Sequence, residues 1–153
     1  MPDRTRPIFR RAVIALTGGP IDTETVRLAV ELGRPAKAEL VGVHVVEIDW
    51  TLPLDADIAG HSEDAQRVLD LAEGMAERLG HRMESVLVQA RDVGAALVDE
   101  AVERDADLLI LGLPYRTQFG GEFALGRTIL YALKNAPCAV WVVRETMPEE
   151  HRS

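Results

Sequence analysis

Short, uninterrupted apolar runs alternate along this chain with longer segments of helical periodicity, and this alternation is the strongest constraint on its fold. The first run, AVIAL, covers residues 12–16, and the second, LVGVHVV, covers 40–46. A run without polar alternation suits a strand that is covered on both faces, as in a parallel sheet. Residues 84–89, 108–111 and 138–143 complete a set of five predicted strands.

The segments between these strands have the periodicity and the end signals of helices. Asp22 or Thr23 can cap the first helix, Ser62 the second and Asp92 the third, because such side chains accept hydrogen bonds from the free N–H groups of a first turn. A short fourth helix is predicted to begin at Gly126. Strands that alternate with helices predict an α/β fold, a five-stranded parallel sheet with helices on both faces.

The bulk properties of the chain exclude several classes of partner. Its 153 residues suit one globular domain, placed at residues 11–145 between an N-terminal lead-in (1–10) and a charged tail (146–153). A net charge of −8 disfavours a nucleic-acid partner. No apolar run approaches the roughly 20 residues that cross a bilayer, so no membrane partner is predicted. The single cysteine, Cys138, fits a reducing compartment, and we expect a cytoplasmic protein.

The segment from residue 108 to 143 carries the clearest candidate site. Its first strand ends at Gly112, a glycine-rich loop follows, and Gly126 opens the short helix. Glycines let a ligand approach the backbone, and the free N–H groups and dipole of a helix start favour negative charge. The pattern predicts a small anionic ligand at the carboxyl ends of the strands, where strand order reverses.

Other side chains give weaker predictions. Cys138 opens an apolar strand and is interpreted as a small core residue rather than a nucleophile. A metal cluster of His44, Glu47 and Asp49 is disfavoured, because alternating strand faces place His44 and Glu47 on opposite sides of the sheet. The irregular segment that follows either covers part of a site or is a surface loop with Trp50 against the core. No dedicated general base is evident, so neither a catalytic residue nor a metal is predicted.

Four segments resemble the universal stress protein family, over nearly the whole chain. They are AVIALTGG, VHVVE, ADLLILG and, most strongly, GRTILYALKNAPCAVWVV. The resemblance implies a Rossmann-like fold of the adenine nucleotide alpha hydrolase type, with strand order 3-2-1-4-5. It also implies a homodimer, often built by pairing the fifth strands, here residues 138–143. Such pairing would cover an exposed apolar edge, although Trp141 in that strand could instead belong to the core.

Nucleotide-binding members of that family resemble one another in a loop motif, G-x-x-G-x9-G-[ST], and in an Asp that ends the first strand. This chain keeps Gly112 and Gly126, but Tyr115 stands at the second glycine and ten residues separate it from Gly126. Arg127 occupies the hydroxyl position, with Thr128 one step later.

A further departure is Thr17, which stands where the Asp would be and still offers a weaker donor and acceptor. Tyr115 adds a ring where close backbone contact is expected. Arg127 could bind phosphate through its guanidinium, or fill the phosphate space by pairing with a loop carboxylate such as Glu122. Arg116 could likewise bind phosphate or fill the phosphate space.

Three functions follow. The first is a cytosolic, homodimeric stress-response module, a small-molecule sensor or regulatory adaptor with a modified adenine-nucleotide (ATP or AMP type) pocket. That pocket is expected at Thr17, Gly18, Val45, Val46, Leu111, Gly112, Tyr115, Arg116, Gly126, Arg127 and Thr128. The alternative is a homodimeric interaction protein that binds no nucleotide because Tyr115 and Arg127 close the pocket. A slow ATPase is the third.

Overall fold

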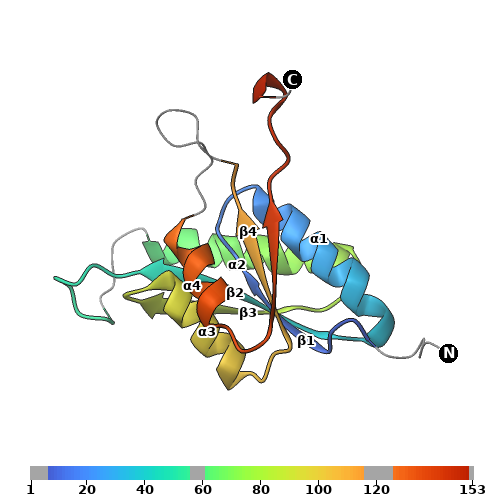
Figure 1. Cartoon of the computed structure of the whole chain (residues 1–153), viewed down its shortest axis with the longest axis horizontal. Coiled ribbons are helices and arrows are strands. Elements are labelled where there is room, and N and C mark those ends of the chain that lie inside the picture. The colour runs from blue at the N-terminus through green and yellow to red at the C-terminus, as the bar shows by residue number, and fades with distance from the viewer. Residues whose placement is uncertain (1–6, 56–60, 116–125, 152–153) are drawn as a thin grey trace.

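A computed structural model describes residues 7–55, 61–115 and 126–151 of the chain (Figure 1). Helices and strands alternate along it as the apolar runs predict. In chain order the elements are β1 (Arg11–Ala15), α1 (Ile21–Gly33), the 3-10 turn η1 (Arg34–Ala36), β2 (Glu39–Glu47), α2 (His61–Arg78), β3 (Glu84–Ala90), α3 (Val93–Glu103), β4 (Leu108–Leu113), α4 (Arg127–Asn135), β5 (Ala139–Arg144) and the 3-10 turn η2 (Glu149–His151).

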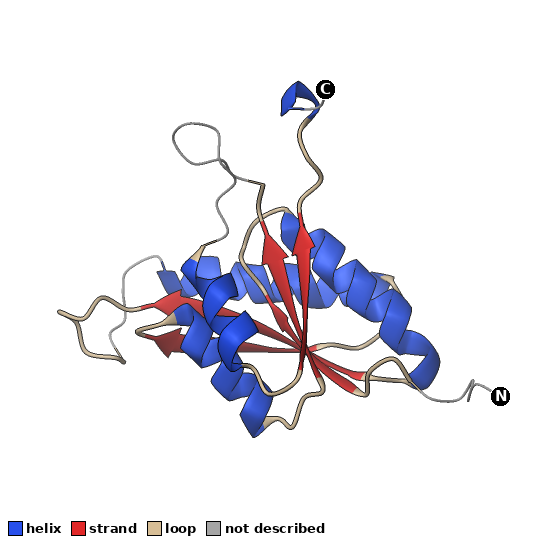
Figure 2. Cartoon of the chain, viewed as in Figure 1, coloured by secondary structure: helices blue, strands red, loops and turns tan. Residues whose placement is uncertain are grey.

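The five strands form one parallel sheet in the order β3-β2-β1-β4-β5, which confirms the expected fold (Figure 2). Val13 of β1 pairs with Val41 of β2 on one side and Leu109 of β4 on the other. From β1 the chain proceeds to β2 and β3 on one side of the sheet. It then returns to the other side of β1, where β4 and β5 lie. That reversal places the ligand-binding position of such a sheet at the carboxyl ends of β1 and β4.

Two apolar cores lie on the two faces of the sheet, because successive strand residues point in opposite directions. Ile14 belongs to the core beneath α1 and α2, whereas its neighbour Val13 belongs to the core beneath α3 and α4. Figure 1 shows the same division of the helices. No helix within the described ranges is long and apolar enough to span a membrane.

Two aromatic side chains differ from the sequence prediction. Phe9, which was assigned to the lead-in, is buried and meets Trp141 of β5 edge to face, with ring centroids 5.9 Å apart. Trp141 thus packs against the core from the outer strand. Trp50 does not pack against the core: it is 80% exposed, and the Arg91 guanidinium lies 5.2 Å from its ring centroid.

The predicted helix caps have mixed outcomes. Asp92 caps α3 as expected, since its carboxylate accepts a 2.9 Å hydrogen bond from the N–H of Ala95. Helix α2 begins at His61, so Ser62 lies inside the helix and not at its cap. Helix α1 follows Pro20 without a side-chain cap, and Asp22 has a different function that is described below.

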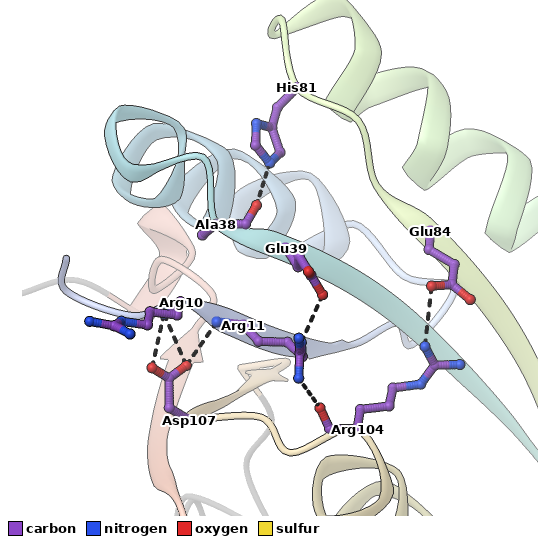
Figure 3. Close-up of polar contacts among 8 residues, drawn as sticks. All are labelled: Arg10, Arg11, Ala38, Glu39, His81, Glu84, Arg104 and Asp107. Atoms are coloured by element: carbon purple, nitrogen blue, oxygen red, sulfur yellow. Dashed lines mark hydrogen bonds and ion pairs between the residues drawn. The ribbon is translucent and has the colours of Figure 1, made fainter.

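The amino ends of the strands are joined by polar contacts (Figure 3). The Asp107 carboxylate, just before β4, accepts hydrogen bonds of 2.9–3.1 Å from the N–H groups of Arg10 and Arg11. The Arg11 side chain pairs with Glu39 at 2.7 Å and donates to the Arg104 carbonyl. These contacts connect β1, β2, β4 and the end of α3, so we call this end of the sheet the amino edge.

Candidate functional site

A cavity of about 410 Å³ lies at the opposite, carboxyl edge of the sheet, where β1, β2 and β4 end beside the start of α4. Its apolar part includes Ala15, Val43, Leu97 and Ile129, which belong to the core beneath α3 and α4. Of the predicted site residues, the structure brings together Thr17, Val45, Leu111, Gly112, Gly126, Arg127 and Thr128.

The other predicted site residues lie elsewhere. Gly18, Val46 and Tyr115 are not among the residues that line the cavity. Arg116 lies outside the described residues. Larger hollows of about 990 and 680 Å³ occur near the amino edge, but they are lined by side chains already paired there, such as Glu39 and Arg11. The cavity at the carboxyl edge is therefore the stronger candidate, because it lies where strand order reverses.

Asp22 holds the loop that leaves β1. Its side chain is buried, with 6% exposed, and its carboxylate accepts hydrogen bonds of 2.8 Å from the N–H groups of Thr17 and Gly18 and one of 2.9 Å from the Thr17 hydroxyl. The prediction that Asp22 caps α1 is wrong, because the carboxylate reaches back to the strand end instead. The N–H groups of this loop are consequently directed at a carboxylate.

The hydrogen bonds of the Thr17 hydroxyl fix which group it donates to and which group it accepts from. Its hydroxyl donates to Asp22 and accepts a 3.0 Å hydrogen bond from the N–H of Gly19. A hydroxyl has one proton and two lone pairs, so one acceptor position is left for a ligand in the cavity. Thr17 can therefore recognise a donor, such as an amino or hydroxyl group, and cannot at the same time donate to a phosphate.

His44 supports the same loop from the other face of the sheet. Its Nδ1 lies 2.8 Å from the Leu16 carbonyl oxygen, so Nδ1 carries the proton and donates. Its Cε1 is 4.0 Å from the position that a Cβ on Gly18 would occupy. His44 is thus a support for the loop, and the described residues contain no group of three metal-ligating side chains.

The start of α4 supplies the donor side of the cavity. Gly126 has a φ of +86°, a conformation that favours glycine, and a Cβ at this position would have no atom of another described residue within 4 Å apart from its chain neighbours. The first N–H groups of a helix have no partner within it, and here they belong to Arg127, Thr128 and Ile129 beside the cavity. Together with the helix dipole, they form an environment that favours an anion.

An ion pair crosses the rim of the cavity. Arg127 Nη2 lies 3.5 Å from Glu47 Oε1, at the end of β2, and the two side chains are 79% and 52% exposed. Glu47 is on the same face of β2 as Val45 and Val43, which lie two and four residues earlier. The predicted partner Glu122 lies outside the described residues. Glu47 was considered from the sequence only as part of the disfavoured metal cluster and not as a partner of Arg127, although its alternation with Val45 indicated the correct face.

Tyr115 points to the end of β5. Its N–H donates a 3.0 Å hydrogen bond to Glu145 Oε2, and the Arg144 guanidinium carbon lies 5.0 Å from its ring centroid. The Glu145 N–H in turn donates to the Leu113 carbonyl, which extends the pairing of β4 and β5. The prediction that Tyr115 fills the cavity is therefore wrong, because its ring is held beside Arg144.

Gly112 has a packing function as well as a place in the cavity wall. A Cβ at this position would lie 2.8 Å from Cγ2 of Ile21 and 3.4 Å from Cγ2 of Thr25, both in α1. The missing side chain therefore allows the start of α1 to approach the end of β4. Cys138, after α4, is partly buried, and burial raises the pKa of its thiol, which agrees with a packing residue.

Comparison with known proteins places this geometry in a family. The model of the universal stress protein family matches residues 8–144. A universal stress protein of Methanocaldococcus jannaschii is 24% identical over 148 residues, which cover 93% of this chain and 86% of the relative.

Solved structures share the fold. The universal stress protein from Archaeoglobus fulgidus superimposes with a TM-score of 0.73 at 20% identity, covering 89% of this chain and 99% of the other. Its complex with dAMP gives a TM-score of 0.70 at 19% identity, covering 89% and 98%. A universal stress protein from Arabidopsis thaliana with AMP bound gives 0.62 at 14% identity, covering 91% and 94%. With the family model matched over nearly its whole length, the chain belongs to the universal stress protein family.

Proposed function

We propose that this protein binds an adenine nucleotide in the cavity at the carboxyl edge and acts as a small-molecule sensor or regulatory adaptor in a stress response. The observation that carries the proposal is the position of the α4 start, where Gly126, Arg127 and Thr128 line the cavity beside the ends of β1 and β4. Solved relatives that contain dAMP or AMP share this fold and support the ligand class.

The two ends of the cavity differ in a way that suits such a ligand. The phosphate lies at the first turn of α4, where N–H groups and the helix dipole favour negative charge. The base and sugar lie toward Thr17 and Val45, between apolar walls and one free acceptor on the Thr17 hydroxyl. A nucleotide has hydrogen-bond donors on its base and sugar and a negative charge on its phosphate. These match the acceptor at Thr17 and the anion-favouring start of α4.

The proposed function is binding rather than catalysis, in the cytoplasm, by a homodimer. Among the described residues, β5 pairs with β4 on one side and with no strand on the other, so its outer edge can pair with a second copy of the chain. Val142 on that strand is 38% exposed, and dimer formation would bury it. A binding module of this kind transmits ligand occupancy through its dimer.

The second candidate is a homodimeric interaction protein that binds no nucleotide. The outer edge of β5 favours it too, because dimer formation through that edge does not depend on the cavity. The two candidates differ in one respect only, which is whether an adenine nucleotide stabilises the folded protein.

Thermal unfolding with AMP, cyclic AMP and ATP separates them. A ligand at about 100 times its Kd stabilises the folded state by about 2.7 kcal/mol, which raises the melting temperature measurably. No shift with any of the three at millimolar concentration would contradict nucleotide binding and leave the interaction protein.

Paired glycine variants locate the site. Gly126 and Gly80 have nearly equal positive φ values, +86° and +83°, but Gly80 follows α2 near the amino edge. Both positions have the positive φ that favours glycine, so alanine at either position costs backbone strain. We expect Gly126→Ala to lose the nucleotide-induced shift and Gly80→Ala to keep it. Equal shifts in both variants would place the ligand away from α4.

A further inference from the structure

We infer that Glu47 limits how many phosphates the cavity accepts, so that the site takes a nucleoside monophosphate in preference to a di- or triphosphate. The inference rests on the proposed nucleotide site and adds a specificity-determining residue to it. It starts from the ion pair between Glu47 and Arg127 at the rim, 3.5 Å long.

The phosphate end of the cavity has a single set of donors among the described residues that line it. The N–H groups of Thr17 and Gly18 donate to the Asp22 carboxylate, so the loop after β1 offers none to a phosphate. What is left is the first turn of α4. A phosphate bound there lies next to the Arg127 side chain and therefore next to the carboxylate of Glu47.

The charged side chains around this position have no net positive charge. Arg127 is the cationic side chain that lines the cavity in the described part of the chain, and Glu47 balances it. Asp22 adds a buried carboxylate behind the Thr17 loop. Two further cations at this edge do not line the cavity: Arg91 lies over the Trp50 ring and donates to the Asp49 carbonyl, and Arg144, at the end of β5, lies beside the Tyr115 ring. The described residues that line the cavity therefore supply no excess positive charge to neutralise a long phosphate chain.

The weakness of the pair explains why one phosphate is still accepted. An exposed ion pair contributes only about 0–1 kcal/mol, so a phosphate can take the place of Glu47 beside Arg127. Each additional phosphate adds negative charge within about 8 Å of Glu47, the distance over which physiological salt leaves charges unscreened. Repulsion grows with the number of phosphates, whereas the number of cations stays the same.

Titration calorimetry with adenosine, AMP, ADP and ATP tests the inference, at physiological salt with EDTA to exclude magnesium. For the natural protein we expect AMP to bind more tightly than ATP. Glu47→Gln removes the carboxylate and keeps the shape, and we expect ATP affinity to rise about threefold to tenfold and AMP affinity by less. Arg127→Gln should weaken both nucleotides.

Glu84→Gln is the matched control. Glu84 is 62% exposed and pairs with Arg104 at 3.2 Å, but it lies at the amino edge, so this variant makes the same change in net charge far from the cavity. A ratio of ATP to AMP affinity that rises in Glu47→Gln and not in Glu84→Gln supports the inference.

Two results would overturn it in distinguishable ways. If ATP binds more tightly than AMP in the natural protein, or both glutamate variants leave the ratio unchanged, Glu47 has no influence on phosphate number although the nucleotide site stands. If none of the four compounds binds to the natural protein or to Glu47→Gln, the nucleotide site itself is wrong and this inference is lost with it.

Discussion

The two edges of the sheet are built from similar residues but arranged for different purposes. At the amino edge, carboxylates and guanidinium groups are directed at one another and at backbone groups of neighbouring strands, as in the contacts of Arg11 with Glu39 and Arg104 (Figure 3). At the carboxyl edge, Asp22 and His44 hold one loop, while the start of α4 faces a cavity. Polar residues therefore indicate a binding function in this sheet only where some of their hydrogen-bonding capacity is left open.

The strongest test of this contrast removes the carboxylate behind the cavity. Asp22→Ala leaves the N–H groups of Thr17 and Gly18 without their acceptor in a mostly buried place, and we expect a loss of about 2–4 kcal/mol in the free energy of unfolding. Urea denaturation measures it. Asp99→Ala, at an exposed position of α3, is the control and should change stability by less than about 0.5 kcal/mol. Equal losses would mean that Asp22 does not hold the loop.

A second test crowds the junction between β4 and α1. Gly112→Ala places a Cβ 2.8 Å from Ile21, and we expect it to cost about 1–3 kcal/mol and to displace the start of α1. Gly74→Ala inside α2 is the control, because its Cβ would meet only the end of the Arg78 side chain at 3.4 Å. That variant should be neutral or slightly stabilising. A neutral Gly112→Ala would show that the close approach is not needed.

A substitution at the amino edge is expected to lower the stability of the protein without changing its affinity for a nucleotide. Asp107→Ala removes the acceptor for the N–H groups of Arg10 and Arg11, and it should cost about 1–2 kcal/mol because these groups can turn to water at an exposed site. Nucleotide affinity should not change. Denaturation and calorimetry on the same variant check both points, and a loss of affinity without a loss of stability would show that the edges are coupled.

The smallest expected effect is the pH dependence of stability that arises from Glu39. A hydrogen bond from Arg11, and its charge, lower the pKa of Glu39 below its ordinary value of 4.5. The folded state therefore gains from ionised Glu39 above about pH 4.5, and this gain is lost as the pH falls through the lowered pKa. Melting temperatures of the natural protein and Glu39→Gln should converge on acidification from pH 7 to pH 3. If the difference between the two melting temperatures stays constant over this pH range, the Arg11–Glu39 pair does not contribute to the pH dependence of stability.

Most of the fold was predictable because apolar runs and glycine or proline stops are local signals. AVIAL and LLILG indicated buried strands, and Asp92 indicated a cap, all of which the structure confirms. Strand order came from the family resemblance and is confirmed as well. The position of the site followed from the strand order, since the cavity lies where the order reverses.

The errors concern side chains whose partners are distant in space or ambiguous in sequence. Asp22 looks like a helix cap because an acidic residue near a helix start can bond forward or backward, and only the folded loop shows that it bonds backward to Thr17. Tyr115 was placed in the cavity by counting motif positions. Its partners are Arg144, the last residue of β5, and Glu145, which follows that strand and is thirty residues from Tyr115. Neither contact has a local signal.

The central claim is that the open donors of the carboxyl edge, and not the paired groups of the amino edge, bind the nucleotide. Amide chemical-shift mapping by ¹⁵N NMR during an AMP titration tests it most directly. We predict saturable shifts at Thr17 and at Gly126 to Ile129, with no shifts at Arg10, Arg11 or Asp107. Absence of shifts at the start of α4, or shifts centred on the amino edge, would contradict it.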